Sequence, residues 1–99
     1  MTPWPEARTS HASCAFEDIM YVHGGSTLND QSSADTLWQL DLRSLAWHKL
    51  PQKDNVGLPK GLYGHTITWF MGDLYLFGGT TGFDYFRHFV KYSLVSKEW

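Results

Sequence analysis

Five histidines and one cysteine are the side chains of this sequence that could bind a metal ion or act in catalysis. The histidines are His11, His23, His48, His65 and His88. No two of them have the spacing of the ligands in a helical zinc site. Cys14 lies in an expected strand, where a small buried side chain is common, and no base is placed to activate its thiol. We therefore expect no catalytic residue, no metal site and no cofactor.

The glycine-rich run Gly78–Gly82 is the segment that most resembles a phosphate-binding loop. It follows an expected strand, but the pattern after it does not predict a helix whose N-terminus could receive a phosphate. The chain also lacks a Gly-x-Ser-x-Gly motif and a carboxylate pair placed by any catalytic motif. These observations predict a protein that is not an enzyme.

Two glycine doublets, Gly24-Gly25 and Gly78-Gly79, each end an apolar run and lie 54 residues apart. That offset also aligns His11 with His65, so the chain is a tandem repeat. Further aligned pairs are Pro5 with Pro59, Tyr21 with Tyr75 and, at an offset of 52 beyond the doublets, Leu42 with Leu94 and Trp47 with Trp99. Because His11 and His65 share one repeat position, we expect both to be structural, each imidazole being hydrogen-bonded to the backbone.

Short apolar runs separated by turn residues predict antiparallel strands in both copies. The expected strands are 11–16, 19–23, 37–42 and 46–50 in the first copy, and 65–70, 73–77 and 89–94 in the second. A fourth strand of the second copy has only begun at Glu98-Trp99. No window has helical periodicity with caps, so we expect essentially no helix.

Each copy resembles a kelch repeat, the four-stranded blade of a β-propeller, whose period is about 50 residues. The matching elements are Ser10-His11, Met20–Gly25, Trp38, Asp41-Leu42 and Trp47 in the first copy, and His65, Leu74–Gly79, Tyr92, Leu94 and Trp99 in the second. The resemblance implies an all-β fold with two four-stranded antiparallel blades, residues 5–50 and 51–99, forming part of a propeller. Leu62 replaces Arg8 and Ser93 replaces Asp41, which puts some polar contacts between blades in doubt.

The repeated glycines and aromatic residues are expected to support the fold rather than bind a ligand. Glycine allows a positive φ or a close backbone approach, and large aromatic rings supply area where blades stack. The expected structural residues are Gly24, Gly25, Gly78, Gly79, His11, His65, Trp38, Trp47, Trp69, Tyr75 and Trp99. Two blades leave apolar outer faces, so we expect further kelch blades, from a longer chain or from other copies.

The composition indicates a packed domain, and it narrows the classes of partner. The chain has 99 residues, of which 42% are hydrophobic and 16% aromatic, with a formal net charge of -2. No run of Lys or Arg could follow a phosphate backbone, and no apolar stretch reaches the roughly 20 residues of a membrane span. We therefore expect no nucleic acid and no membrane partner. The lone cysteine and the start of the sequence favour an intracellular, most simply cytoplasmic, location.

Three loops should gather on one face of the blades, because antiparallel strands alternate in direction. They are Ser26–Thr36, Pro51–Leu62 and Thr80–His88. The third has the aromatic and arginine composition of binding hot spots. The candidate partner-binding residues are Phe83, Asp84, Tyr85, Phe86 and Arg87, with Asn29 and Asp30 of the first loop. In the alternative interpretation, Phe83 or Phe86 folds back over a missing blade.

These patterns predict a protein-interaction module that binds a protein or peptide. The run Gly78–Tyr85 is similar to a loop of kelch-domain substrate receptors of cullin-RING ubiquitin ligases, which implies a role in substrate recognition. The alternative is a fragment of a kelch-fold enzyme, an oxidase or a sugar isomerase, whose active site lies outside this chain.

Overall fold

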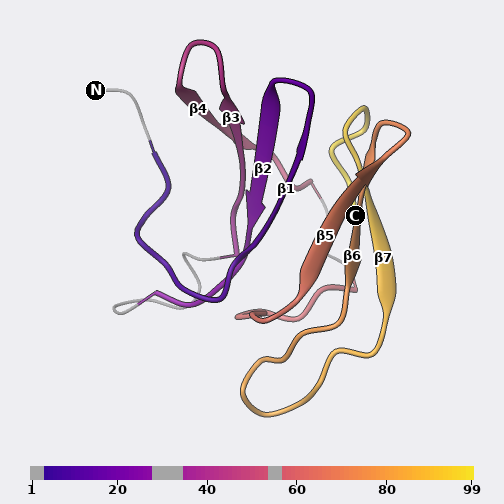
Figure 1. Ribbon diagram of the computed structural model, residues 1–99. Helices are drawn as coiled ribbons and strands as arrows, with labels where there is room; N and C mark the ends of the chain where they lie inside the picture. Colours follow the sequence, from indigo (N-terminus) through magenta and orange to yellow (C-terminus); the bar gives the residue numbers. More distant parts are fainter. Residues whose placement is uncertain (1–3, 28–34, 54–56) are drawn as a thin grey trace.

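The computed structural model describes residues 4–27, 35–53 and 57–99 of the chain, and this part contains seven strands and no helix (Figure 1). The first sheet has the order β1-β2-β3-β4, and its strands are Ala12–Phe16, Ile19–His23, Leu37–Asp41 and Ala46–Leu50. The second has the order β5-β6-β7, and its strands are Thr66–Phe70, Asp73–Phe77 and Phe89–Ser93. All neighbouring strands pair antiparallel.

The predicted all-β fold is therefore confirmed, and the strand positions are close to those expected. Three strands have the predicted limits, while the other four are shorter by one residue at one end. In the second sheet, a single antiparallel bridge between Ser93 and Glu98 stands in the place of the fourth strand. Each sheet is a meander of consecutive strands. Turns of two to four residues join β1 to β2, β3 to β4 and β5 to β6, while longer loops join β2 to β3 and β6 to β7.

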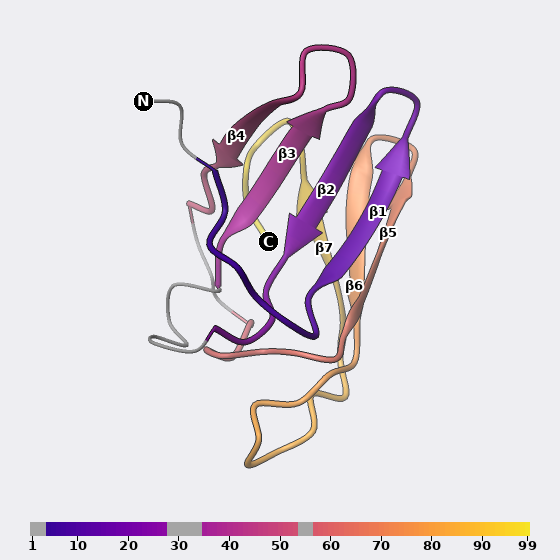
Figure 2. The ribbon, with the colours of Figure 1, turned by 60° about the vertical axis from the view of Figure 1, so that its left-hand side comes forward.

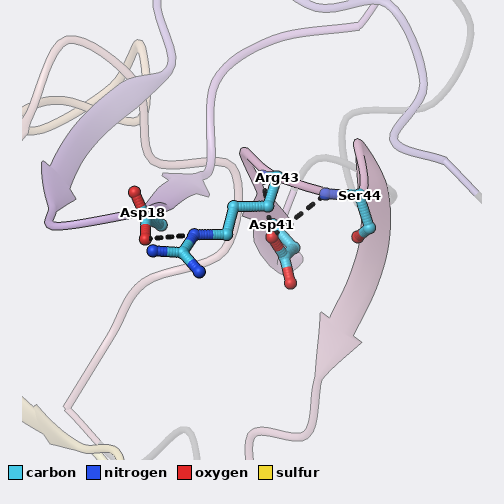
Figure 3. Close-up of polar contacts among 4 residues, drawn as sticks. All are labelled: Asp18, Asp41, Arg43 and Ser44. Carbon is cyan, nitrogen blue, oxygen red and sulfur yellow. Dashed lines mark hydrogen bonds and ion pairs between the residues drawn. The ribbon is translucent and has the colours of Figure 1, made fainter.

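The β3–β4 turn is closed by the carboxylate of Asp41 (Figure 3). Its Oδ1 accepts hydrogen bonds from the backbone N–H groups of Arg43, at 2.9 Å, and Ser44, at 3.3 Å. These two bonds are the main reason that the pKa of Asp41 lies below its usual range. Arg43 also reaches back to the β1–β2 turn, where its Nε lies 2.7 Å from Asp18 Oδ2.

Ser93 performs the same task in the second copy. Its Oγ accepts hydrogen bonds from the N–H groups of Val95, at 3.3 Å, and Ser96, at 3.1 Å. The replacement of Asp41 by Ser93 thus affects a turn within a blade, and the sequence-based inference that it alters a contact between blades was wrong. A hydroxyl oxygen and a carboxylate oxygen can accept the same pair of backbone donors.

The core lies between the two sheets, which stack side by side with β1 next to β5 (Figures 1 and 2). The least exposed apolar side chains in the described residues are Leu37, Leu62, Leu74, Leu76 and Tyr92. Phe16 of β1 stacks on Trp69 of β5, with ring centroids 3.4 Å apart and planes within 5°. This contact confirms the stacking role expected of Trp69.

Strand alternation places three other predicted aromatic residues on the opposite sides of the sheets. Leu37 is in the core between the sheets, so its neighbour Trp38 points outward, where it meets Trp47 edge to face at 6.4 Å. Likewise Tyr75 lies between the core residues Leu74 and Leu76 in sequence and points away from the first sheet. The expectation that these rings fill the interface between the two blades was therefore wrong for this pair of blades.

All four repeated glycines have a positive φ, from +70° to +102°. A Cβ on Gly24 would lie 2.5 Å from His65 Cε1, and a Cβ on Gly79 would lie 2.8 Å from His65 Cβ. A Cβ on Gly25 would lie 2.7 Å from the Thr9 carbonyl oxygen. At Gly78 a Cβ would meet nothing within 4 Å. The doublets thus combine a left-handed backbone with close approach at three of the four positions.

Replacing Gly24 by alanine should therefore destabilise the chain more than replacing Gly78. Both variants force a side chain into the left-handed region, at about 1–2 kcal/mol. The Gly24→Ala variant must also displace His65, so we expect it to lose at least about 1 kcal/mol more. Urea unfolding followed by tryptophan fluorescence measures both losses, and equal losses would contradict the role given to close packing.

Candidate functional site

The loops between strands gather at one end of the two sheets, opposite the short hairpin turns (Figures 1 and 2). The described residues 26–27, 35–36, 57–62 and 80–88 lie at this end, as expected, whereas the residues that follow β4 run along the sheets, where the Lys53 N–H donates to the Lys97 carbonyl at 2.9 Å. Asn29 and Asp30, two of the candidate partner-binding residues, lie outside the described residues. The loop of residues 80–88 is described throughout and carries the other five candidates.

Two threonine hydroxyl groups hold the tip of this loop. Thr80 Oγ1 donates a hydrogen bond to the Asp84 carbonyl at 2.7 Å and accepts one from the Gly82 N–H at 3.0 Å. Thr81 Oγ1 accepts hydrogen bonds from the N–H groups of Phe83 and Asp84, both at 3.4 Å. The hydroxyl groups satisfy backbone groups that a loop would otherwise leave to water, so the tip has a defined shape.

The base of the loop is fixed by backbone hydrogen bonds to the segment before β5 and within the loop, and by one aromatic ring that packs on the core. Thr80 and Tyr63 exchange two N–H to carbonyl bonds, each 2.9 Å long, and the Phe86 N–H donates to the Gly79 carbonyl at 2.8 Å. The half-buried ring of Phe86 packs against the core and meets His88 edge to face at 5.3 Å. Phe86 is thus an anchor of the loop rather than part of its exposed surface.

The remaining candidates of this loop are exposed. Phe83 is 95% exposed and Tyr85 is 77% exposed, and Asp84 and Arg87 are also exposed. The loop therefore presents two aromatic rings, a carboxylate and a guanidinium on a backbone that is already ordered. This combination suits recognition of a peptide or protein surface.

A pair of buried histidines lies between the blades, just inside the loop face. His23 Nδ1 and His65 Nε2 are 2.9 Å apart, a hydrogen-bonding distance, and the rings meet edge to face. The sequence predicted a backbone partner for His65, and this hydrogen bond adds a side-chain partner from the preceding blade. His11, which shares the repeat position of His65, is exposed. No sequence signal joined His23 to His65, because they are 42 residues apart and meet only when the blades stack.

Burial is the main reason that both imidazoles have low pKa values, about 3 for His23 and about 4 for His65. The neighbouring His65 and then Arg8 lower the pKa of His23 further, while a hydrogen bond with the His23 backbone partly offsets the lowering at His65. Both rings are therefore neutral at neutral pH, and one can donate the shared hydrogen bond while the other accepts it. Two protonated imidazoles would present two donors to each other and lose that bond.

Trp99 completes this cluster from the second copy. Its ring lies 5.1 Å from His23 and 5.2 Å from Tyr92, and its Nε1 donates to Gln52 Oε1 at 2.6 Å. Gln52 belongs to the connection between the blades and in turn donates to the Asp35 carbonyl at 2.8 Å. The predicted structural role of Trp99 thus takes the form of a contact that joins both blades and their linker.

Of the residues considered for chemistry in the sequence, His23 and His65 lie together between the blades. No group of three or more His, Cys, Asp or Glu side chains that could hold a metal ion occurs among residues 4–27, 35–53 and 57–99. Burial raises the pKa of the half-buried Cys14 thiol, which disfavours the reactive thiolate. The same ranges contain no helix that is long and apolar enough to cross a membrane.

Comparison with known proteins gives matches along the whole chain. The model of the KLHDC2/KLHL20/DRC7 Kelch-repeats domain matches residues 1–99. Host cell factor 2 of Homo sapiens is 36% identical over 81 residues, which is 76% of this chain and 10% of that protein. Rab9 effector protein with kelch motifs of Xenopus laevis is 32% identical over 85 residues, 84% of this chain and 23% of that protein. The chain thus spans less than a quarter of either relative.

A solved structure, that of YjhT, has the same fold. It superposes with a TM-score of 0.71 at 23% sequence identity, covering 99% of this chain and 27% of that one. The likeness extends through both sheets, so the relative placement of the two blades is part of it.

The buried histidine pair should make stability depend on pH in the mildly acidic range. Because the folded pKa values lie below the ordinary 6.5, the unfolded chain binds more protons below about pH 6.5, and stability falls as the pH drops through this range. At about pH 5 we expect each histidine to lower the free energy of unfolding by about 2 kcal/mol relative to about pH 7.5.

Urea unfolding at several pH values measures the fall in the free energy of unfolding at acidic pH. The His23→Phe variant should show a smaller fall, because it removes one of the two buried imidazoles. Phenylalanine is the chosen substitute because Phe77 occupies the equivalent position in the second copy. The exposed His48 provides the control, and His48→Phe should leave the pH dependence as it is. An unchanged acid sensitivity in His23→Phe would contradict the assignment.

Proposed function

Because this chain belongs to the kelch-repeat family, whose domains are typically protein-interaction modules, we propose that it binds a protein or peptide through the loop of residues 80–88. The observation that carries the proposal is the exposure of Phe83 and Tyr85 on a loop whose backbone is already fixed. Aromatic rings contribute most to binding when ordering them costs little entropy.

The chemistry of the loop defines the segment that it would bind. Phe83 and Tyr85 offer ring surface to apolar side chains, while Arg87 offers a planar guanidinium to a carboxylate. Asp84, between the two rings in sequence, disfavours a second carboxylate near them and favours a basic or neutral neighbour. We therefore infer a ligand segment with apolar side chains and one acidic group.

We further propose that this binding serves substrate recognition for a cullin-RING ubiquitin ligase, in a non-enzymatic role inside the cell. Support comes from the similarity of the run Gly78–Tyr85 to the corresponding loop of kelch-domain substrate receptors. The name of one relative, the Rab9 effector protein with kelch motifs, also connects a protein with kelch motifs to a second protein.

Selection from a random-peptide display library on the immobilised chain tests the loop directly. Selected peptides should bind the wild-type chain in fluorescence anisotropy. The double variant Tyr85→Ala and Arg87→Ala should bind the same peptides at least about tenfold more weakly, because it loses about 2 kcal/mol of binding free energy. Val95→Ala is the matched control, because Val95 is 91% exposed in the turn after β7, and β7 separates this turn from the loop of residues 80–88.

Peptides that bind the loop variant as tightly as the wild type would exclude this loop as the site. The ligase role has a separate readout, the ubiquitylation of a reporter fused to a selected peptide in cells that express the chain. A reporter that stays unmodified, while the peptide still binds, would remove the ligase role and leave the interaction role in place.

A further inference from the structure

The short hairpin turns, at the end opposite the loop of residues 80–88, carry exposed apolar side chains. Leu45 of the β3–β4 turn is 71% exposed, and Met71 of the β5–β6 turn is 77% exposed. The β1–β2, β3–β4 and β5–β6 turns lie at the same end of the two sheets (Figures 1 and 2). We call residues 17–18, 42–45 and 71–72 the turn face.

The tandem repeat shows that these turns do not need apolar residues. The equivalent of Met71 in the first copy is Glu17, and the equivalent of Leu45 in the second copy is Lys97. All four have the same left-handed backbone, with φ between +50° and +64°. Leu45 and Lys97 each donate their N–H to the carbonyl of the residue four positions before, at 2.7 and 2.8 Å. The same turn thus forms with a charged side chain or with an apolar one.

The two apolar residues are also held in a conformation that is unfavourable for them. Leu45 has a φ of +60° and Met71 a φ of +50°, a region in which Gly, Asn and Asp are far more common. Neither residue belongs to the core, so burial does not offset the strain. Strained residues of this kind gather at functional sites. Folding therefore does not explain why Leu45 and Met71 are apolar.

Contacts between neighbouring turns join these positions into one surface. Arg43 Nε lies 2.7 Å from Asp18 Oδ2, which connects the β3–β4 turn with the β1–β2 turn (Figure 3). The stacked rings of Phe16 and Trp69 connect the β1–β2 turn with the β5–β6 turn, because each ring lies within two positions of its turn. Apolar residues gathered in this way mark interaction sites, whereas single exposed ones are common on any surface.

The exposure of the turn face does not depend on how many blades the propeller has. Blades of a propeller pack around a central channel through the flat sides of their sheets. The hairpin turns lie at the ends of the strands, so they stay open on one face of the ring when further blades are added. The turn face is thus distinct from the surfaces at which blades stack.

The charged groups of the turn face are mainly acidic. They are the carboxylates of Glu17, Asp18 and Asp41 and the guanidinium of Arg43. Arg43 pairs with Asp18, and Asp41 accepts the N–H groups of its own turn. No ion pair to Glu17 occurs among residues 4–27, 35–53 and 57–99. The carboxylate of Glu17 is therefore available to a cation of a bound partner.

From this arrangement we propose that the turn face binds a segment of a partner protein that carries bulky apolar side chains and a lysine or arginine. Leu45 and Met71 contact the apolar side chains, and Glu17, in the turn that connects theirs, pairs with the cation. This site lies at the opposite end of the blades from the loop of residues 80–88. The chain can therefore hold two partners at once.

Peptide selection on a chain with an altered loop tests the turn face separately from that loop. A random-peptide display library is selected on the Tyr85→Ala and Arg87→Ala double variant, and fluorescence anisotropy then measures binding of the selected peptides to each chain. Peptides rich in apolar and basic residues should bind the wild type and the loop variant equally. They should bind the double variant Leu45→Lys and Met71→Glu at least about tenfold more weakly, as loss of two central apolar contacts would.

The repeat itself supplies the control for folding. Leu45→Lys and Met71→Glu give each turn the residue that the other copy has there, so this variant should unfold at the urea concentration of the wild type. If it does not, Leu45→Gly and Met71→Gly take its place, because glycine accepts a positive φ. Glu17→Gln should weaken the same peptides about threefold, the contribution of an exposed ion pair.

Two results would overturn the proposal. One is a selection in which every peptide binds the turn-face variant as tightly as the wild type, or in which no peptide is recovered. The other is a set of turn-face peptides that are acidic or that bind Glu17→Gln unchanged. Neither result bears on the loop of residues 80–88, since that loop is altered in the selected chain.

Discussion

Stacking of the second blade on the first depends on a backbone approach that only glycine permits. His65 of the second blade sits against Gly24 of the first and against Gly79 of its own, so an added methyl group at either position would collide with the imidazole. The same approach allows the Gly25 N–H to donate to the Leu62 carbonyl at 3.0 Å and the Gly64 N–H to donate to the Ser10 carbonyl at 2.9 Å. The glycines thus set the distance between the blades, and the loop of residues 80–88 inherits its position because Gly79 also anchors Phe86.

Most of the fold could be read from the sequence because its signals are local. Strand alternation, turn residues and the repeated glycine doublets each act within a few residues, and they located all seven strands of the described chain. The family resemblance supplied the stacking of the blades. The face on which each aromatic residue lies was harder, since Trp38 and Trp69 look alike in sequence and differ only in whether their strand position points toward the other blade.

The candidate site was also predictable only in part from the sequence. Composition singled out the loop after Gly79, but it could not separate the exposed Phe83 from the anchored Phe86, because either ring satisfies the same pattern. The hydrogen bond between His23 and His65 was not predictable, since two residues 42 positions apart leave no local trace of their contact. The three-dimensional structure was therefore needed to show which aromatic ring of the loop is exposed and which histidines meet between the blades.

Trp99 has a consequence for how this chain can come apart. Its indole contacts His23 in one blade and Tyr92 in the other, and its N–H holds Gln52 in the connection between them. Separation of the two blades would break the contacts that Trp99 makes with both blades and with the connection between them. Repeat proteins can lose terminal units singly, as fraying ends of a one-dimensional array. Here the contacts of Trp99 couple the two units, because opening either blade breaks a ring contact of this indole.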